Sequence, residues 1–439
     1  MRTTIATLAG VFLAFAIPAS GNELEDSIAQ DYGGYLGALF VDLHEHPELS
    51  LAEFKTSERM AEELRKAGFE VTEHVGGTGV VAMLHNGEGP LVMMRSDMDG
   101  LPIEEKTGLP YASKAQQRDP VTGVVDPVMH ACGHDVHMTS LVGTARQMAA
   151  RRDEWHGTLM LVAQPAEERG MGAKAMREDQ IWERFGQPDY VLGFHVKANN
   201  VAGTINVTPA PYAGVDSVDI IVHGVGGHGA NPHLTKDPIV IGSEIVMALQ
   251  TLVSRELPPR VPGVVTVGAF QAGAKHNIIP DEAHLMLTVR NTSPETRELL
   301  LSGIERIAKN IGRAAGLSED MLPEVIVANE STPPLLNDVK LMERLKGAWS
   351  KAMGSDAVIS KEETGMLGED FPYFTIDPAI PTVFWDVGGT PQEAFDRAAA
   401  GGEPVATHHS PLFKIAPEPA VRAGIESTVV ALLELMGNP

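Results

Sequence analysis

One nine-residue stretch, residues 129–137, holds three of the 16 histidines of the chain together with its only cysteine. Cys132 has no second cysteine to pair with, so it is either a small buried hydrophobe or a thiolate ligand of a metal ion. His134 is two residues away on the same predicted loop, so the two side chains can reach one metal centre together. We favour the metal ligand because further metal-competent side chains follow along the chain.

A two-metal site needs about five ligands and a carboxylate that takes a proton from water. Glu167 and Glu168 are adjacent on a turn after a predicted strand, where neighbouring side chains diverge, so one can bind metal while the other faces the water. His195 follows another predicted strand, and His408-His409 precedes Ser410-Pro411. Each group alone is typical of a solvated carboxylate pair, a structural histidine or an exposed loop. Their shared position at one predicted sheet edge favours a site.

Short apolar runs alternate with helical patterns in the first and last parts of the chain. Buried strands are expected over residues 80–84, 91–94, 159–162, 191–194 and 383–385. Helices are expected over residues 36–68 (with a turn at Pro47), 138–149 and 417–436. Polar residues follow several of the strands, and in open α/β sheets this carboxyl edge is where active sites form.

The middle of the chain has a different pattern. Strands with alternating apolar residues are expected over residues 218–222, 264–270, 283–289 and 324–328, and helices over residues 237–256 and 294–315. The order β-α-β-β-α-β is the ferredoxin-like arrangement. We therefore predict an inserted domain over residues 211–328, within a domain that residues 22–210 and 329–439 form together.

Residues 1–21 have the pattern of a secretory signal peptide. Arg2 is their only charge, residues 8–17 are apolar, and residues 19–21 offer a small-x-small cleavage site. An uncleaved anchor is the alternative, but the short apolar segment favours cleavage. A periplasmic or secreted protein that is not inserted in the membrane is then expected. The formal net charge of −24 argues against nucleic acid and anionic membrane surfaces as partners.

Several other motifs are interpreted as structural. His44-Glu45-His46-Pro47 has a ligand-like spacing, but it sits in an early helix away from any strand end. His130 and His137 flank the cluster and are not assigned to the metal. The glycine-rich residues 224–229 lack the Lys-Ser/Thr of a phosphate loop. The sequence has no Gly-x-Ser-x-Gly motif in a strand-turn-helix context, which argues against a serine hydrolase.

Taken together, the motifs resemble the aminoacylase-like dinuclear metallopeptidases, and within them the amidohydrolase branch of hippurate and auxin-conjugate hydrolases. The resemblance covers nearly the whole mature chain and rests on residues 43–50, 96–102, 129–137, 164–168, 226–228, 277–281, 368–371 and 409–411. It implies a mixed-sheet, zinc-peptidase-like α/β catalytic domain with an inserted ferredoxin-like α/β domain that serves as a lid or in dimerisation.

The resemblance also implies two divalent metal ions per chain, of zinc, cobalt, nickel or manganese. Their five ligands would be Cys132 (bridging), His134, Glu168, His195 and His409. His409 is chosen over His408 because it directly precedes Ser410-Pro411. Glu167 resembles the general base that activates the metal-bound water and later protonates the leaving amine.

Four further residues have roles that the resemblance implies. Asp99 resembles the acid that orients a metal ligand. The substrate carboxylate and the tetrahedral oxyanion would be held by residues of the inserted domain, namely His228, Asn277 and Arg290. In this family the equivalent of His228 often acts across a dimer interface, so a homodimer through the inserted domain is expected.

Two positions depart from the family pattern. Arg169 follows the glutamate pair where this branch usually has glycine, and it either points to solvent or alters the charge near the site. Leu367-Gly368-Glu369-Asp370 stands where the family more often has Gly-Ser-Glu-Asp, a difference that concerns the local turn.

These patterns predict a metal-dependent amidohydrolase that cleaves the amide bond of N-acyl amino acids, with hippurate-like substrates. A dipeptidase or carboxypeptidase that cleaves short peptides on the same dinuclear site is the alternative. A third hypothesis is a binding protein for metal or amino acids with a decayed active site. That hypothesis predicts a missing ligand or base, and none is missing from the sequence.

Overall fold

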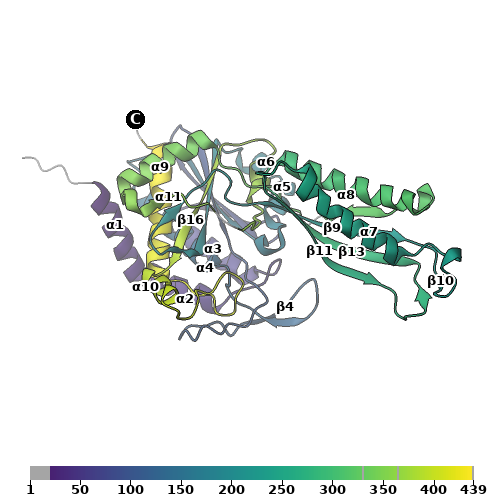
Figure 1. Cartoon of the computed structure of the whole chain (residues 1–439). Coiled ribbons are helices and arrows are strands. Elements are labelled where there is room, and N and C mark those ends of the chain that lie inside the picture. The colour runs from purple at the N-terminus through teal and green to yellow at the C-terminus, as the bar shows by residue number, and fades with distance from the viewer. Residues whose placement is uncertain (1–19, 329–330, 363–364, 438–439) are drawn as a thin grey trace, which may run out of the picture.

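The computed structural model describes residues 20–328, 331–362 and 365–437. The predicted signal peptide, residues 1–21, lies almost entirely outside these ranges. Figure 1 shows two parts of different architecture: a broad body around a large sheet, here named the main domain, and an elongated inserted domain that carries α7 and α8.

The main domain is built on one mixed sheet with the strand order β1-β2-β6-β3-β7-β16-β8-β15. The strands are β1 (Glu70–Val75), β2 (Gly79–Asn86), β3 (Leu91–Asp97), β6 (Gly157–Gln164), β7 (Tyr190–Val201), β8 (Ile205–Asn206), β15 (Val358–Ile359) and β16 (Thr382–Thr390). The central strands β6, β3, β7 and β16 run parallel, whereas β1 and β2 pair antiparallel with their neighbours. At the other edge, β8 pairs antiparallel with β16 and parallel with β15. Helices cover both faces of the central strands, which explains their continuous apolar runs.

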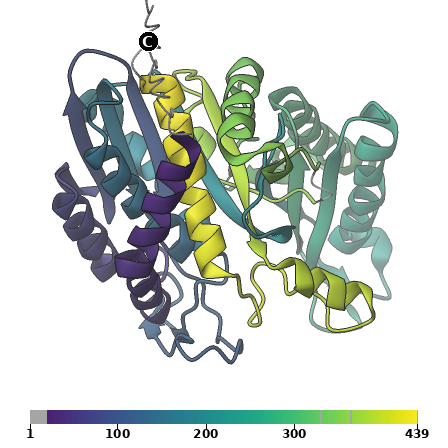
Figure 2. The same cartoon turned by 90° about the vertical axis from the view of Figure 1, so that its left-hand side faces the viewer.

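Most helices of the main domain lie on one face of the sheet. They are α1 (Ser20–Asp31), α2 (Gly37–Glu45), α3 (Phe54–Lys66), α4 (His134–Ala150), α9 (Val339–Met353) and α11 (Pro417–Met436). The opposite face is covered by α5 (Gly172–Glu178) and α6 (Ile181–Phe185), and α10 (Gln392–Ala399) is peripheral with no fully buried residue. Figure 2 shows α11 running across the domain with α1 beside it.

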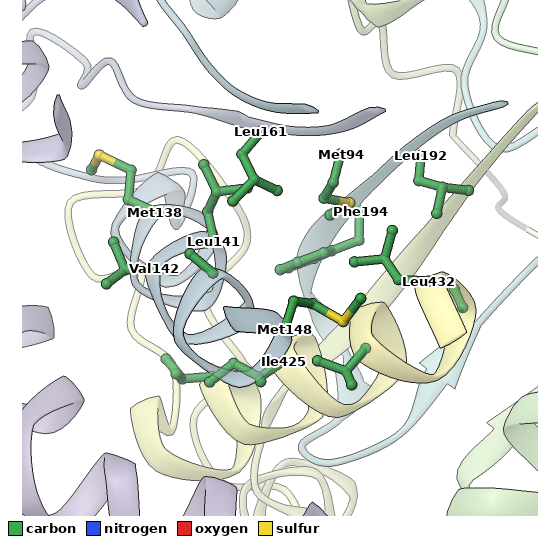
Figure 3. Close-up of a cluster of buried hydrophobic side chains, with 14 of the residues drawn as sticks. Met94, Met138, Leu141, Val142, Met148, Leu161, Leu192, Phe194, Ile425 and Leu432 are labelled. Atoms are coloured by element: carbon green, nitrogen blue, oxygen red, sulfur yellow. The ribbon is translucent and has the colours of Figure 1, made fainter. Parts of the chain in front are cut away.

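The larger apolar core lies between the sheet and the two helices α4 and α11. In Figure 3, Leu141 of α4 lies near Leu161 of the sheet, whereas Ile425 of α11 packs against α4, and all three side chains are buried. Each such side chain contributes about 1.5–3 kcal/mol on burial. This packing fixes the position of α4, and therefore of its first residue, His134, relative to the ends of the central strands.

The inserted domain has a four-stranded antiparallel sheet with the order β11-β13-β9-β14 and two helices on one face. Its elements are β9 (Gly214–His223), α7 (Pro238–Thr251), β11 (Gly263–Ala272), β13 (Glu282–Asn291), α8 (Pro294–Ala314) and β14 (Glu324–Val327). Buried and partly exposed residues alternate along β9 and β13, as in a sheet with one covered face. The predicted fold class, with its ferredoxin-like insertion, is confirmed. The exact domain boundaries stay predictions.

Two short pairs of strands complete the structure. β10 (Gly227–His228) pairs with β12 (Ile278–Ile279), and Figure 1 shows β10 at the end of the inserted domain that lies farthest from the main domain. β4 (Gln116–Arg118) pairs with β5 (Val125–Pro127) in the main domain.

The buried His44 links α2 to α4, as expected for a structural residue. Its Nδ1 lies 2.6 Å from Asp135 Oδ2, and its Nε2 lies 3.3 Å from a carboxylate oxygen of Glu105. Burial by itself lowers the pKa of His44, but the hydrogen bonds to Asp135 and Glu105 raise it to about 10. The folded state therefore holds the charged ring more tightly than the unfolded chain does.

We predict that replacing His44 with Gln lowers the free energy of unfolding by about 3 kcal/mol at pH 6, because one partner of a buried ion pair is lost. A raised pKa stabilises the folded state fully below the unfolded value of about 6.5, and this stabilisation disappears as the pH rises toward 10. The difference between wild type and His44→Gln, measured by urea unfolding, should shrink over this range. A constant difference would contradict the assigned ion pair.

Candidate metal centre

A cavity of about 550 Å³ at the carboxyl edge of the central strands is lined by four of the five predicted ligands, and the fifth, His134, is buried next to them. Cys132 Sγ lies 3.3 Å from His195 Nε2, and His409 Nε2 lies 3.2 Å from Glu168 Oε2. His134 Nε2 lies 3.8 Å from Glu168 Oε1. Cys132 belongs to two groups whose ligand atoms all lie within 4.8 Å of one another, one with His134 and His195 and one with Glu168 and His409. A thiolate in this position can serve two ions.

Gly133 sets the geometry of the loop that carries Cys132 and His134. It has a φ of +89°, and a Cβ at this position would lie 2.3 Å from Val196 Cγ1, so only glycine fits. α4 begins directly afterwards at His134. His134 Nδ1 donates to the carbonyl oxygen of Asp99 at 2.8 Å, which directs the opposite nitrogen, Nε2, toward the cluster.

Asp99 also holds the turn that carries the two glutamates. Its carboxylate accepts hydrogen bonds from the backbone N–H of Glu167 at 3.2 Å and of Glu168 at 3.1 Å, and from Ser50 Oγ at 2.6 Å. Ala166, just before the pair, has a φ of +49°, a strained conformation for a residue with a Cβ. Asp99 thus positions the glutamate turn with its carboxylate and His134 with its backbone.

His195 lies inside β7 and not after its end, which corrects the predicted end of this strand at residue 194. β7 continues to Val201 because buried residues such as Val196 and Ala198 follow the histidine and β16 pairs alongside them. His195 Nδ1 donates to the Val196 carbonyl at 2.6 Å, so Nε2 faces Cys132.

The two adjacent histidines of the last loop have different surroundings. His408 Nε2 donates to the Val196 carbonyl at 2.9 Å, and burial lowers its pKa to about 3. His409 has a φ of +62°, its backbone N–H donates to the Ala131 carbonyl, and its ring faces Glu168. The structure therefore directs His409, and not His408, toward the cluster.

A buried ionic network beside the cluster was not identified from the sequence. Arg95 forms ion pairs with Asp97 at 2.8 Å, Glu369 at 2.8 Å and Asp370 at 3.3 Å. Asp97 also lies 2.5 Å from His137 Nδ1, and His137 Nε2 accepts a hydrogen bond from Val196 N. Both ring nitrogens of His137 are thus in use. An arginine inside an apolar strand was the one signal for this network.

The carboxyl group of Glu167 has a pKa well above its usual range. Burial is the main cause, and the neighbouring carboxylates of Glu369 and Glu168 add to it. Burial, with Glu168 and Glu167 nearby, also raises the pKa of the Cys132 thiol. Cations brought among these groups would favour their charged forms, so metal binding would release protons.

The donor set fits divalent metal ions. Among the described residues, the buried atoms His134 Nε2 and Glu168 Oε1 have no hydrogen-bond partner. Both atoms belong to the cluster, together with a thiol and two further imidazoles. Thiolate and imidazole are ligands of zinc and similar borderline-soft metals, and carboxylate widens the range toward manganese.

The three predicted substrate-binding residues are not all at the cavity. Arg290 lines it, and its Nε donates to the Met366 carbonyl at 3.2 Å. His228 and Asn277 do not line it; they lie at the β10–β12 strand pair, at the far end of the inserted domain (Figure 1). The pattern of helices and strands could not reveal this, because it does not give the length or direction of the insertion.

The two departures from the family pattern have physical explanations. Arg169 lines the cavity and donates to Asp119 Oδ2 at 2.6 Å, so it is tied to the β4–β5 hairpin and does not point freely to solvent. A Cβ at Gly368 would lie 2.4 Å from Val215 Cγ2, so the local packing requires glycine there.

Comparison with known proteins places the chain in a family. Residues 93–416 match the model described as Peptidase family M20/M25/M40. The chain belongs to this family. It is 38% identical to the hippurate hydrolase of Campylobacter jejuni over 78% of this chain and 86% of that protein. It is 36% identical to thermostable carboxypeptidase 1 of Saccharolobus solfataricus over 76% of this chain and 80% of that protein.

Solved structures of family members agree with this assignment. A dinuclear metal binding peptidase of Bacillus subtilis, YXEP, matches with a TM-score of 0.73 and 29% identity over 93% of this chain and 99% of that one. As a member of this family, this chain is a metal-dependent amidohydrolase with a divalent metal site. The predicted family, fold and enzyme class are confirmed.

We predict that His409→Gln lowers the bound metal by about one ion per chain, because it removes the histidine that faces Glu168. His408→Gln is the matched control; its amide can still donate to the Val196 carbonyl, so it should keep the wild-type metal content. Metal per chain is measured by elemental analysis after dialysis against metal-free buffer. Equal loss in both variants, or loss in His408→Gln alone, would contradict the choice of His409.

Proposed function

We propose that this enzyme hydrolyses N-acyl amino acids, with hippurate-like substrates, and that its metals are two ions of zinc, cobalt, nickel or manganese. The observation that carries the proposal is the nearly buried carboxyl of Glu167, which faces the ligand cluster in a cavity that Arg290 also lines. The hippurate hydrolase relative supports the substrate class. Residues 1–21 support export to the periplasm or the medium.

Cys132, His134, Glu168, His195 and His409 would hold the metals. When bound, two such ions polarise the amide carbonyl and supply a water of lowered pKa. Glu167, whose own pKa is raised by burial and by Glu369, would accept a proton from the water and return it to the leaving nitrogen. Arg290 would bind the carboxylate of the substrate through its guanidinium.

A carboxypeptidase is the alternative function, and the carboxypeptidase relative favours it. A peptide with a free carboxyl terminus is itself an acylated amino acid, so Arg290 and the cavity fit both substrates. The two functions differ in the acyl half: a simple carboxylic acid in one case and an aminoacyl group in the other.

We predict that Glu167→Gln lowers kcat by about a hundredfold to ten-thousandfold, because the proton acceptor is lost while the ligands stay in place. The measurement is amine release by metal-reloaded protein from N-acetyl, N-benzoyl and longer N-acyl amino acids beside simple dipeptides. Glu104→Gln, an exposed carboxylate, is the control. Retained turnover in Glu167→Gln would show that Glu167 is not the proton acceptor. If the wild-type enzyme hydrolyses mainly dipeptides, the peptidase function is favoured.

We also propose that two chains pair through their inserted domains. The outer face of α7 exposes Val240 and Met247, which are two helical turns apart, and Leu234 and Ile278 are exposed near the β10–β12 strand pair. Among the described residues, the stretch Pro238–Glu256 is apolar and long enough to cross a membrane by length and composition alone. A second copy is the occupant that also explains His228 and Asn277, because it would bring them to the partner's cavity.

We predict that mixing His228→Ala and Glu167→Ala chains restores activity that each lacks alone. In a mixed dimer, the chain with an intact Glu167 receives His228 from its partner, so one of two sites works. Random pairing then gives about a quarter of wild-type activity in a symmetric dimer. Activity is measured after the two variants are refolded together. No recovery, with mixed dimers shown by mass spectrometry, would contradict a role of His228 across the interface.

A further inference from the structure

A buried lysine lines the cavity and has no part in the hydrolytic steps above. Lys197 lies on β7 two residues after His195, so both side chains leave the strand on the same face. The residue is 2% exposed, and its Nζ lies 4.3 Å from the centroid of the Tyr212 ring, a cation–π contact. Tyr212 is itself fixed, because its hydroxyl donates to Asp386 Oδ1 at 3.1 Å.

The surroundings of Lys197 indicate a role beyond balancing the acidic residues of the site. Two acids that line the cavity, Glu369 and Asp370, already form ion pairs with Arg95. An aromatic face attracts an ammonium group but offers none of its N–H donors a strong acceptor. Because the cavity wall has a low dielectric constant, an anion that enters beside this ammonium interacts with it far more strongly than in water.

A second cation lines the same cavity from the inserted domain. Arg290 is held by the backbone carbonyls of Met366 and Val289. Under the proposed function, Arg290 binds the one carboxylate that every N-acyl amino acid carries. Lys197, which comes from the sheet of the main domain, is then available for a different anionic group.

We propose that Lys197 is a specificity-determining residue that binds a second carboxylate of the substrate. This carboxylate is carried either by the amino-acid side chain, as in an N-acylglutamate, or by the acyl group, as in an N-succinyl amino acid. The inference rests on the proposed function and adds that, among N-acyl amino acids, the enzyme prefers those that carry two negative charges.

The test compares kcat/KM for substrate pairs that differ only in the second charge. One pair is N-acetylglutamate and N-acetylglutamine. The other is N-succinylmethionine and the matching compound in which the free carboxyl of the succinyl group is a carboxamide. We expect wild type to prefer the dianion in one pair at least tenfold, and Lys197→Met to reduce that preference by about tenfold to a hundredfold, mainly through KM. Lys197→Arg should keep part of the preference, because it keeps the charge.

Lys351→Met is the matched control, since it removes one positive charge from the exposed end of α9, outside the cavity. It should keep the wild-type preference, which separates local binding from long-range attraction. If the enzyme prefers N-acetylglutamate, the second carboxylate of the substrate lies on its amino-acid part. If it prefers N-succinylmethionine, the second carboxylate lies on the acyl group.

Two results would overturn the assignment of Lys197. One is a wild type with no preference in either pair although it hydrolyses N-acetylmethionine. The other is an equal loss for both members of a pair in Lys197→Met, with unchanged metal content. A wild type that hydrolyses no N-acyl amino acid, but hydrolyses dipeptides, would instead contradict the proposed function.

Discussion

One residue, Asp99, joins the two parts of the metal site, namely the turn that carries the two glutamates and the start of α4. Its oxygens accept the backbone N–H groups of Glu167 and Glu168, and its carbonyl oxygen accepts the ring N–H of His134. These elements come from different strand ends, and no direct hydrogen bond links the glutamate turn to α4 among the described residues. The distance between imidazole and carboxylate ligands therefore depends on where β3 ends, and β3 is held between β6 and β7 at the centre of the sheet.

Electrostatics decides what such a site can do. The cavity gathers several carboxyl groups and a thiol, and burial penalises each negative charge. Arg95 offsets part of this cost for Asp97, Glu369 and Asp370, whereas the carboxyl of Glu167 is left with a raised pKa. Bound cations would stabilise the charged forms of the candidate ligands, and under the proposed function Glu167 takes the proton of the water. Under the proposed function, one buried arrangement serves both metal binding and proton transfer.

The fold class and the convergence of the candidate ligands could be predicted because they depend on local patterns. Apolar runs that end in polar residues mark strand ends, and parallel strands bring those ends together. The end of β7 could not be predicted, because the apolar run resumes after His195. The network around Arg95, the cation–π contact of Lys197 and the remote position of His228 depend on distant parts of the chain, which periodicity does not relate to one another.

Anomalous diffraction from crystals of the zinc-loaded protein tests the dinuclear site most directly. If Cys132 is the shared ligand, two zinc peaks should appear, each about 2.3 Å from its sulfur. His134, Glu168, His195 and His409 should supply the other protein ligands. A single peak, or two peaks that leave the Cys132 sulfur uncoordinated, would contradict a dinuclear centre bridged by this thiolate.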